Sequence, residues 1–176
     1  MRTADESQDR LLHTAVDVSA LYAAEHLRMI RLAALLVDDI DTAEEVVQDA
    51  FLGLTVAVPR LRDANAAVGY LHTSVVNGAR SAMRRRRTGR GVLARTIQPD
   101  PSPPADLGVD AAGTRNEVLA ALGTLPPRMR EVLVLRYWSE LSESQIALTL
   151  GISEGTVKST VSRGLDRLET TLGGAR

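Results

Sequence analysis

The sequence contains no cysteine. A disulfide scaffold and a thiolate zinc site are therefore excluded, and the composition fits a reducing compartment. Aromatic residues are also scarce, at 3% of the 176 residues, whereas hydrophobic residues reach 44% and come mainly from Leu, Val and Ala. Because Ala and Leu favour helices and strand-favouring residues are few, we expect an all-α protein.

Long apolar runs are absent as well. No stretch approaches the roughly 20 apolar residues of a membrane-spanning helix. The polar, acidic start RTADESQDR does not resemble a signal peptide. We therefore expect a cytoplasmic protein without membrane insertion.

The residues that usually carry catalysis or hold metals are dispersed. His13, His26 and His72 have no partners at catalytic or metal-ligand spacing, and no glycine-rich phosphate loop occurs. Acidic neighbours such as Glu44 and Glu45 do not face one another on a helix. We expect no catalytic residues, no cofactor and no metal, and therefore a protein that is not an enzyme.

Charge is balanced overall but not along the chain. The formal net charge is -1. Arginines nevertheless accumulate in one short window, at Arg80, Arg84, Arg85, Arg86, Arg87, Arg90 and Arg95. A cluster of this kind indicates an anionic partner.

The residue patterns predict two small helical domains joined by a flexible linker. Residues 1–15 carry no periodic pattern and are expected to form a mobile tail. Residues 16–90 form the first domain and residues 114–176 the second. Between them, residues 91–113 contain Pro99, Pro101, Pro103 and Pro104, which cannot lie inside a helix.

Within the first domain, apolar spacing predicts helices over residues 19–37, 41–58 and 68–87. Asp41 is the expected N-cap of the second helix, with Glu44 three residues later. The outward face of that helix carries Glu45, Gln48, Asp49, Leu52 and Val56. Leu52 and Val56 require a partner helix, either in this chain or in another protein.

The third helix presents a polar and basic ridge at intervals of three and four residues. Its members are Tyr70, Thr73, Asn77, Arg80 and Arg84. A solvated polar face would explain Thr73 and Asn77 but not the accumulated arginines. The ridge therefore favours nucleic-acid binding, with one ring for stacking and two guanidinium groups for phosphates.

The second domain contains a predicted helix-turn-helix over residues 141–168, built on a core that includes Tyr137 and Trp138. Ser142 with Gln145 forms a capping box, Gly151 ends the first short helix, and Ser153 caps the second. The inward arc of the second helix comprises Val157, Val161, Leu165 and Leu168. The outward arc, which has no acid, comprises Thr156, Ser159, Thr160, Arg163 and Arg167. Such an arc is typical of a helix that reads DNA.

Together these segments resemble one family. The order of DTAEEVVQDAFLGL, GYLHTSVVNGARSAMRRRR, a proline-rich linker and LPPRMREVLVLRYWSELSESQIALTLGISEGTVKS is similar to that of the extracytoplasmic-function (ECF) sigma factors. The resemblance implies a protein that binds core RNA polymerase and directs transcription initiation at minus-35 and minus-10 promoter elements. The implied partners are promoter DNA and the polymerase, through its beta-prime clamp helices and beta flap. An anti-sigma factor is a candidate partner.

The resemblance also implies roles for individual residues. The core-polymerase contact falls on Asp41, Glu45, Gln48, Asp49 and Leu52. The minus-10 contact falls on Arg60, Arg62, Asp63, Asn65, Tyr70, Thr73, Asn77, Arg80 and Arg84, with the loop over 60–67 in the place that captures a flipped base. The minus-35 contact falls on Glu154, Gly155, Thr156, Lys158, Ser159 and Arg163.

Two positions depart from the family pattern, and two other functions compete with it. Tyr70 stands where many relatives carry Trp, and Thr160 where many carry Arg, so both bear on promoter preference. The same C-terminal segment is similar to the DNA-binding domain of response regulators, which would require an upstream parallel sheet. An anti-sigma-like interaction protein would leave the arginine ridge without a function.

Overall fold

The computed structural model describes residues 16–37, 39–92 and 112–173. In these ranges the chain forms helices and turns without any strand, which confirms the all-α prediction. The helices are α2 (Val18–Ala34), α3 (Ile40–Ala57), the short 3-10 helix η1 (Val58–Arg60), α4 (Ala64–Val92), α5 (Ala112–Thr124), α6 (Pro127–Tyr137), α7 (Glu143–Leu150) and α8 (Glu154–Gly173). The tail predicted over 1–15 and most of the linker predicted over 91–113 lie outside the described residues.

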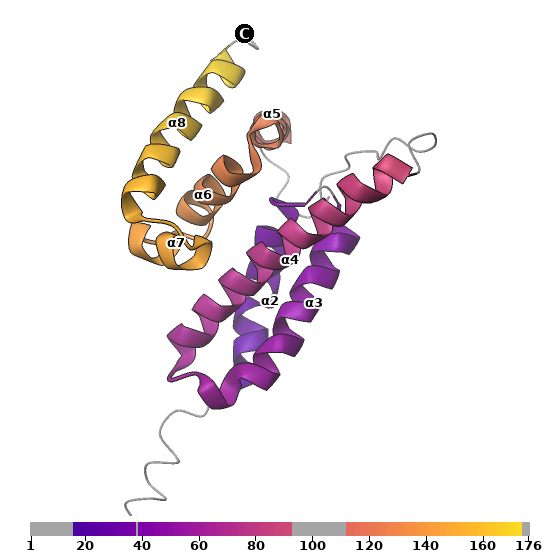
Figure 1. Ribbon diagram of the computed structural model, residues 1–176, viewed down its shortest axis with the longest axis vertical. Helices are drawn as coiled ribbons and strands as arrows, with labels where there is room; N and C mark the ends of the chain where they lie inside the picture. The colour runs from indigo at the N-terminus through magenta and orange to yellow at the C-terminus, as the bar shows by residue number, and fades with distance from the viewer. Residues whose placement is uncertain (1–15, 38, 93–111, 174–176) are drawn as a thin grey trace, which may run out of the picture.

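Helices α2, α3 and α4 pack against one another as an N-terminal bundle (Figure 1). Their predicted apolar stripes provide its core, because those stripes face inward on all three helices. The fully buried side chains are Met29, Leu32, Val47, Leu54, Leu71, Val75 and Val76. Removal of this much apolar surface from water is the main force that holds the bundle together.

The start of α3 differs from the sequence prediction, because the N-cap is Asp39 and not Asp41. The Asp39 side chain accepts a hydrogen bond of 2.8 Å from the backbone N–H of Thr42. Arg86 of α4 forms an ion pair with the same carboxylate and also donates to the Thr42 hydroxyl. Asp41 is left exposed in the first turn. The aspartate that caps α3 is thus the one that also pairs with Arg86, which lies 47 positions later in the chain.

The environment of Asp39 also affects its ionisation. Partial burial on its own would raise the pKa of Asp39, but hydrogen bonds from Thr42 and the charge of Arg86 outweigh burial and lower this pKa. The carboxylate therefore stays ionised where it caps the positive end of the helix dipole.

The C-terminal helices confirm the predicted helix-turn-helix. Ser142 and Gln145 form a capping box at the start of α7, and Gly151 ends α7 in the left-handed conformation, with φ of 64°. Ser153 accepts a hydrogen bond from the backbone N–H of Thr156 at the start of α8. Helix α7 lies at the lower end of α8 in Figure 1, and both pack against α6. The ends of α7 and the start of α8 are thus fixed by residues that lie within a few positions of one another in the sequence.

The buried face of α8 is rotated relative to the prediction. Thr160 is 4% exposed, so the prediction that it lies on the outward arc is wrong. Leu165, predicted to face inward, is 41% exposed. Gly164 accounts for this: a Cβ atom built there would lie 2.9 Å from Leu133 Cδ1, so α8 approaches α6 closely at this glycine. The centre of the contact therefore lies between Val157, Thr160 and Gly164.

The end of α6 also differs from the prediction. Tyr137 and Trp138 are 59% and 43% exposed and do not form part of the buried core. They occupy the last position of α6 and its C-cap, where the chain leaves the packed region. Their place in the core is taken by Val134, which is buried one turn earlier.

The N-terminal bundle and the C-terminal helices are packed together. Helix α4 contacts α7, and α4 lies beside α6 and α7 in Figure 1. One continuous group of buried apolar residues includes Leu71 and Val75 from α4 together with Val132, Leu135 and Ile146 from α6 and α7. In the described ranges no helix is both long enough and apolar enough to cross a membrane.

Candidate partner and nucleic-acid interfaces

The outward face of α3 is a strip of acidic and apolar side chains. Glu45, Gln48 and Asp49 are exposed on it, as the helical periodicity predicts, and Asp41 is exposed in the first turn of the same helix. Leu52 is 60% exposed and Val56 is 75% exposed. The described part of the chain therefore does not bury these two apolar side chains.

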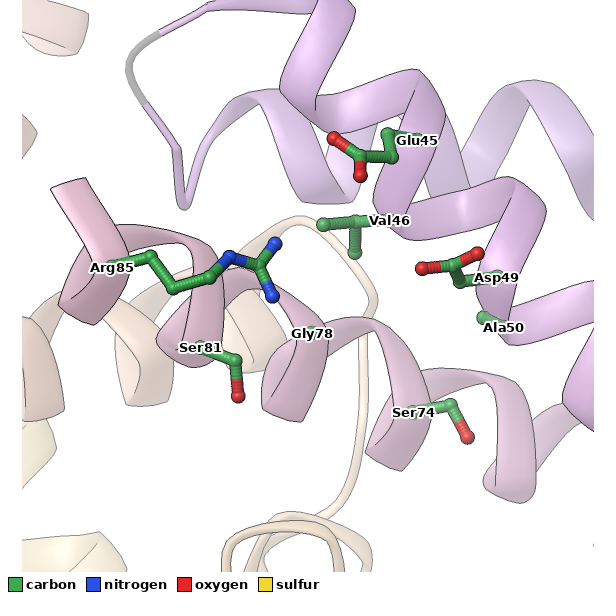
Figure 2. A pocket seen from close by; sticks show the side chains of 8 residues that line it. All are labelled: Glu45, Val46, Asp49, Ala50, Ser74, Gly78, Ser81 and Arg85. Carbon is green, nitrogen blue, oxygen red and sulfur yellow. The ribbon is translucent and has the colours of Figure 1, made fainter.

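A pocket of about 150 Å³ borders this acidic strip. Glu45 and Asp49 line it from α3, and Ser74, Gly78, Ser81 and Arg85 line it from α4 (Figure 2). A Cβ atom at Gly78 would lie 2.8 Å from Val46 Cγ1, so the two helices make a close approach beside the pocket. The charged groups that line the pocket are the carboxylates of Glu45 and Asp49 and the guanidinium group of Arg85.

The loop and helix predicted to contact minus-10 DNA are divided between exposed and half-buried positions. Exposed residues are Arg60, Arg62, Asp63, Asn65, Asn77 and Arg84; half-buried residues are Tyr70, Thr73 and Arg80. Asp63 accepts a hydrogen bond of 2.8 Å from the backbone N–H of Ala66 and thus caps α4. The Thr73 hydroxyl donates to the Gly69 carbonyl within its own helix.

Tyr70 does not lie on the ridge as an outward ring. A Cβ atom built at Gly53 of α3 would lie 2.8 Å from the Tyr70 hydroxyl oxygen, so the phenol is directed across to α3. Its ring packs against the core of the N-terminal bundle. The glycine at position 53 gives the hydroxyl room that a side chain would occupy.

Arg80 is bound by the C-terminal half of the chain. Its Nε donates to Glu131 Oε1 and its Nη2 donates to Glu131 Oε2, each over 2.6 Å. Arg80 Nη1 also donates to Asn77 Oδ1 over 3.3 Å. Hydrogen bonding to Glu131 raises the pKa of Arg80, although burial acts in the opposite direction. This bidentate guanidinium–carboxylate pair is among the stronger side-chain contacts in proteins.

Sequence reasoning missed Glu131, which is 6% exposed. Arg128, one turn earlier on α6, donates to Glu131 Oε2 over 3.2 Å and to the Leu150 carbonyl over 2.9 Å. A signal was available, because Glu131 stands four residues before the buried Leu135 and so lies on the inward stripe of α6. A carboxylate at such a position requires a cationic partner.

The residues predicted to contact minus-35 DNA lie together on the exposed side of α8. Glu154, Gly155, Thr156, Lys158, Ser159 and Arg163 are all exposed. Lys158 pairs with Glu143 of α7 over 3.4 Å, and Arg163 Nε donates to the Ser159 carbonyl over 3.1 Å. These contacts are at the surface, where ion pairs are weak and can exchange for a phosphate.

Comparison with known families matches both halves of the chain. Residues 21–88 match Sigma-70 region 2, and residues 115–168 match Sigma-70 region 4. The RNA polymerase sigma-E factor of Streptomyces coelicolor is 32% identical over 82% of this chain and 79% of its own length. The RNA polymerase sigma factor CarQ of Myxococcus xanthus is 31% identical over 83% of this chain and 79% of its own length.

Solved structures give the same result. The sigma factor RpoE of Bartonella quintana, crystallised with the anti-sigma factor NepR, covers 98% of this chain and 99% of its own with a TM-score of 0.68 and 28% identity. CnrH, solved with the cytosolic domain of CnrY, has a TM-score of 0.67 at 23% identity over 90% and 89%, and is similar in fold. These matches do not favour the response-regulator alternative, whose parallel sheet is also missing from the described ranges. The chain belongs to the ECF family of RNA polymerase sigma factors.

Proposed function

We propose that this sigma factor binds core RNA polymerase through the outward strip of α3. The observation that carries the proposal is the exposure of Leu52 and Val56 beside Glu45, Gln48 and Asp49, on a helix whose opposite face already supplies the core. An apolar pair flanked by acids fits a partner helix with an apolar ridge and basic neighbours. The beta-prime clamp helices are the partner that the family resemblance implies.

Promoter DNA is proposed to contact two separate surfaces. Helix α8 offers exposed Thr156, Lys158, Ser159 and Arg163 to the minus-35 element. The loop after η1 and the ridge of α4 offer Arg60, Arg62, Asn77, Arg80 and Arg84 to the minus-10 element. Both surfaces combine cationic and small polar side chains, which can hold phosphates and reach base edges.

Two further partners follow from exposed residues and from the structural relatives. Tyr137, Trp138 and Leu148 leave apolar surface on the C-terminal helices, and we assign it to the beta flap. An anti-sigma factor is also proposed, since the Bartonella quintana sigma factor was crystallised with one. Acting together with polymerase, the protein would work in the cytoplasm and would contribute no catalytic residues of its own.

The polymerase contact can be tested by Leu52→Glu, with Leu27→Glu as the matched control. Leu27 is also an exposed leucine, at 65%, but it lies on α2. Leu52→Glu is expected to weaken binding to purified core polymerase by about 2 kcal/mol or more, as for a buried interface anchor. Leu27→Glu is expected to bind as the wild type does.

Helical content and thermal unfolding of both variants are measured beside the binding. Equal loss of core binding in the two variants would reject α3 as the polymerase contact. A drop in the helical content of Leu52→Glu alone would mean that Leu52 supports the fold instead.

A further inference from the structure

The ion pair between Arg80 and Glu131 joins the two halves of the chain. Both carboxylate oxygens of Glu131 accept from one guanidinium group, each over 2.6 Å. The Glu131 side chain is 7% exposed, and that of Arg80 is 33% exposed. Because Arg128 also pairs with Glu131, the carboxylate is held between one cation from α4 and one from its own helix.

This contact uses the donors that a nucleic acid would need. A guanidinium group binds a phosphate or a guanine edge through the same paired N–H groups with which it binds a carboxylate. In Arg80 the Nε and Nη2 groups point to Glu131, and Nη1 points to Asn77. Glu131 and Asn77 together take three of the five N–H donors of Arg80, including the Nε–Nη2 pair, and Glu131 neutralises its charge. A promoter phosphate would therefore compete with Glu131 for this guanidinium group.

Apolar packing reinforces the ion pair. Helix α4 contacts α7, and the buried group that includes Val75 of α4 continues into Val132, Leu135 and Ile146. Helices α6 and α7 lie beside α4 (Figure 1), and Arg80 of α4 contacts Glu131 of α6. The outward residues of α8 are exposed in the same arrangement.

We propose that this arrangement is a self-masked state of the sigma factor, in which Glu131 occupies Arg80 in place of a promoter phosphate and the C-terminal helices lie against α4 at this position of the minus-10 ridge. Contact of Arg80 with minus-10 DNA then requires α6 and α7 to move off α4. The inference rests on the proposed role of α4 in DNA binding. It adds a competitor for that surface within the chain itself.

The test is to remove the charge of Glu131 and measure both separation and DNA binding. Because the chain has no cysteine, spin labels can be attached at Thr55→Cys on α3 and Thr170→Cys on α8, both exposed positions. Glu131→Gln is expected to lengthen and broaden the distance distribution between the two labels. Glu169→Gln, which removes the same charge from an exposed position of α8, is expected to leave the distribution unchanged.

DNA binding provides the second readout, with a fluorescein-labelled single-stranded DNA of mixed sequence as the probe. If about nine chains in ten are closed, complete opening tightens the apparent affinity about tenfold, because only the open fraction binds. Glu131→Gln should therefore bind the probe more tightly than Glu169→Gln does. A folded Glu131→Gln variant with unchanged distances and the affinity of Glu169→Gln would overturn the proposal.

If Glu131→Gln loses helical content, the doubly labelled protein that retains Glu131 provides the test instead. Saturation with the DNA probe should then widen the distance between α3 and α8, whereas an unchanged distance with DNA bound would overturn the proposal. Binding to core polymerase is measured separately. A failure there would reject the proposed function, while the distance change on loss of the Glu131 charge reports on self-masking alone.

Discussion

Helices α8 and α4 both carry predicted DNA-binding residues, but their side chains are in different situations. On α8, Thr156, Lys158, Ser159 and Arg163 are exposed. On α4, Arg80 is bound to Glu131 and Tyr70 is directed toward Gly53. Helical periodicity shows which residues face away from the core of their own bundle. It does not show what another part of the chain places over them.

The largest expected effect is the loss of stability when an arginine replaces a buried residue of α8 instead of its exposed neighbour. Thr160→Arg should destabilise the protein by about 3 kcal/mol, because a guanidinium group would lose its water beside α6 without a designed partner. Ser159→Arg, at the adjacent exposed position, should change stability by no more than about 0.5 kcal/mol. Urea unfolding followed by circular dichroism measures both.

The same pair of variants also tests where DNA lies. Ser159→Arg should steepen the salt dependence of minus-35 binding by a log-log slope of about 0.9 for one added phosphate contact. If Thr160→Arg were as stable as the wild type and produced the steeper slope, the buried face of α8 would be assigned wrongly.

A smaller loss of stability is expected from alanine at two glycines that lie where helices pack closely. Each half has a glycine that lies against an aliphatic side chain of a neighbouring helix: Gly78 lies against Val46, and Gly164 lies against Leu133. Alanine at either position should be less stable than Gly69→Ala, which has open space around its Cβ, by about 1–3 kcal/mol for overpacking. Position 78 should be the more sensitive of the two, because Val46 is branched at Cβ and Leu133 can rotate more easily.

Thermal unfolding of the three alanine variants measures this series. Gly69→Ala serves as the reference, because it gains helix propensity of roughly 0.8–1 kcal/mol without a clash. Equal stability of all three variants would show that neither crossing depends on its glycine.

The smallest expected effect is a pH dependence of stability that is confined to the N-terminal bundle. All three histidines of the sequence precede residue 73, and His72 is buried in α4 with its ring nitrogen Nδ1 3.0 Å from the Val68 carbonyl. Burial lowers the pKa of His72, although the hydrogen bond to Val68 and the charge of Glu25 act in the opposite direction. The folded state therefore favours the neutral ring, and the unfolded state takes up the proton first.

Stability of the N-terminal bundle should accordingly be complete above the ordinary histidine pKa of about 6.5 and decline as pH falls below it. Hydrogen exchange of α2–α4 amides, compared with α6–α8 amides, measures the decline. His72→Gln should flatten the pH dependence of the N-terminal amides. Persistence of the full decline in that variant would assign it to other groups.

Local hydrogen bonds explain why much of the C-terminal half could be predicted. Ser142, Gln145, Gly151 and Ser153 act on residues within a few positions of themselves, so a short stretch of sequence contains both partners. The apolar stripes of α3 and α4 were also predictable, because each repeats over several turns. The family resemblance then supplied the expected partners.

The errors arose where a distant residue decides the outcome. Asp39 is preferred to Asp41 as a cap in the presence of Arg86 from another helix. Gly164 allows α8 to approach Leu133 closely, and this approach buries Thr160. A hydrophobicity pattern does not reveal such a contact, because glycine is not counted among the apolar residues that define the buried face. Arg80 and Glu131 are 51 positions apart, and no local pattern pairs them.

The pairing of Arg80 with Glu131 has a consequence for how the protein responds to its own abundance. Both residues belong to one chain, so their pairing is an intramolecular equilibrium. The population of this contact is therefore the same in a dilute and a concentrated sample, whereas occupancy by polymerase follows mass action. Making more of the sigma factor would add masked molecules in constant proportion, whereas a binder that competes for Arg80 would change that proportion.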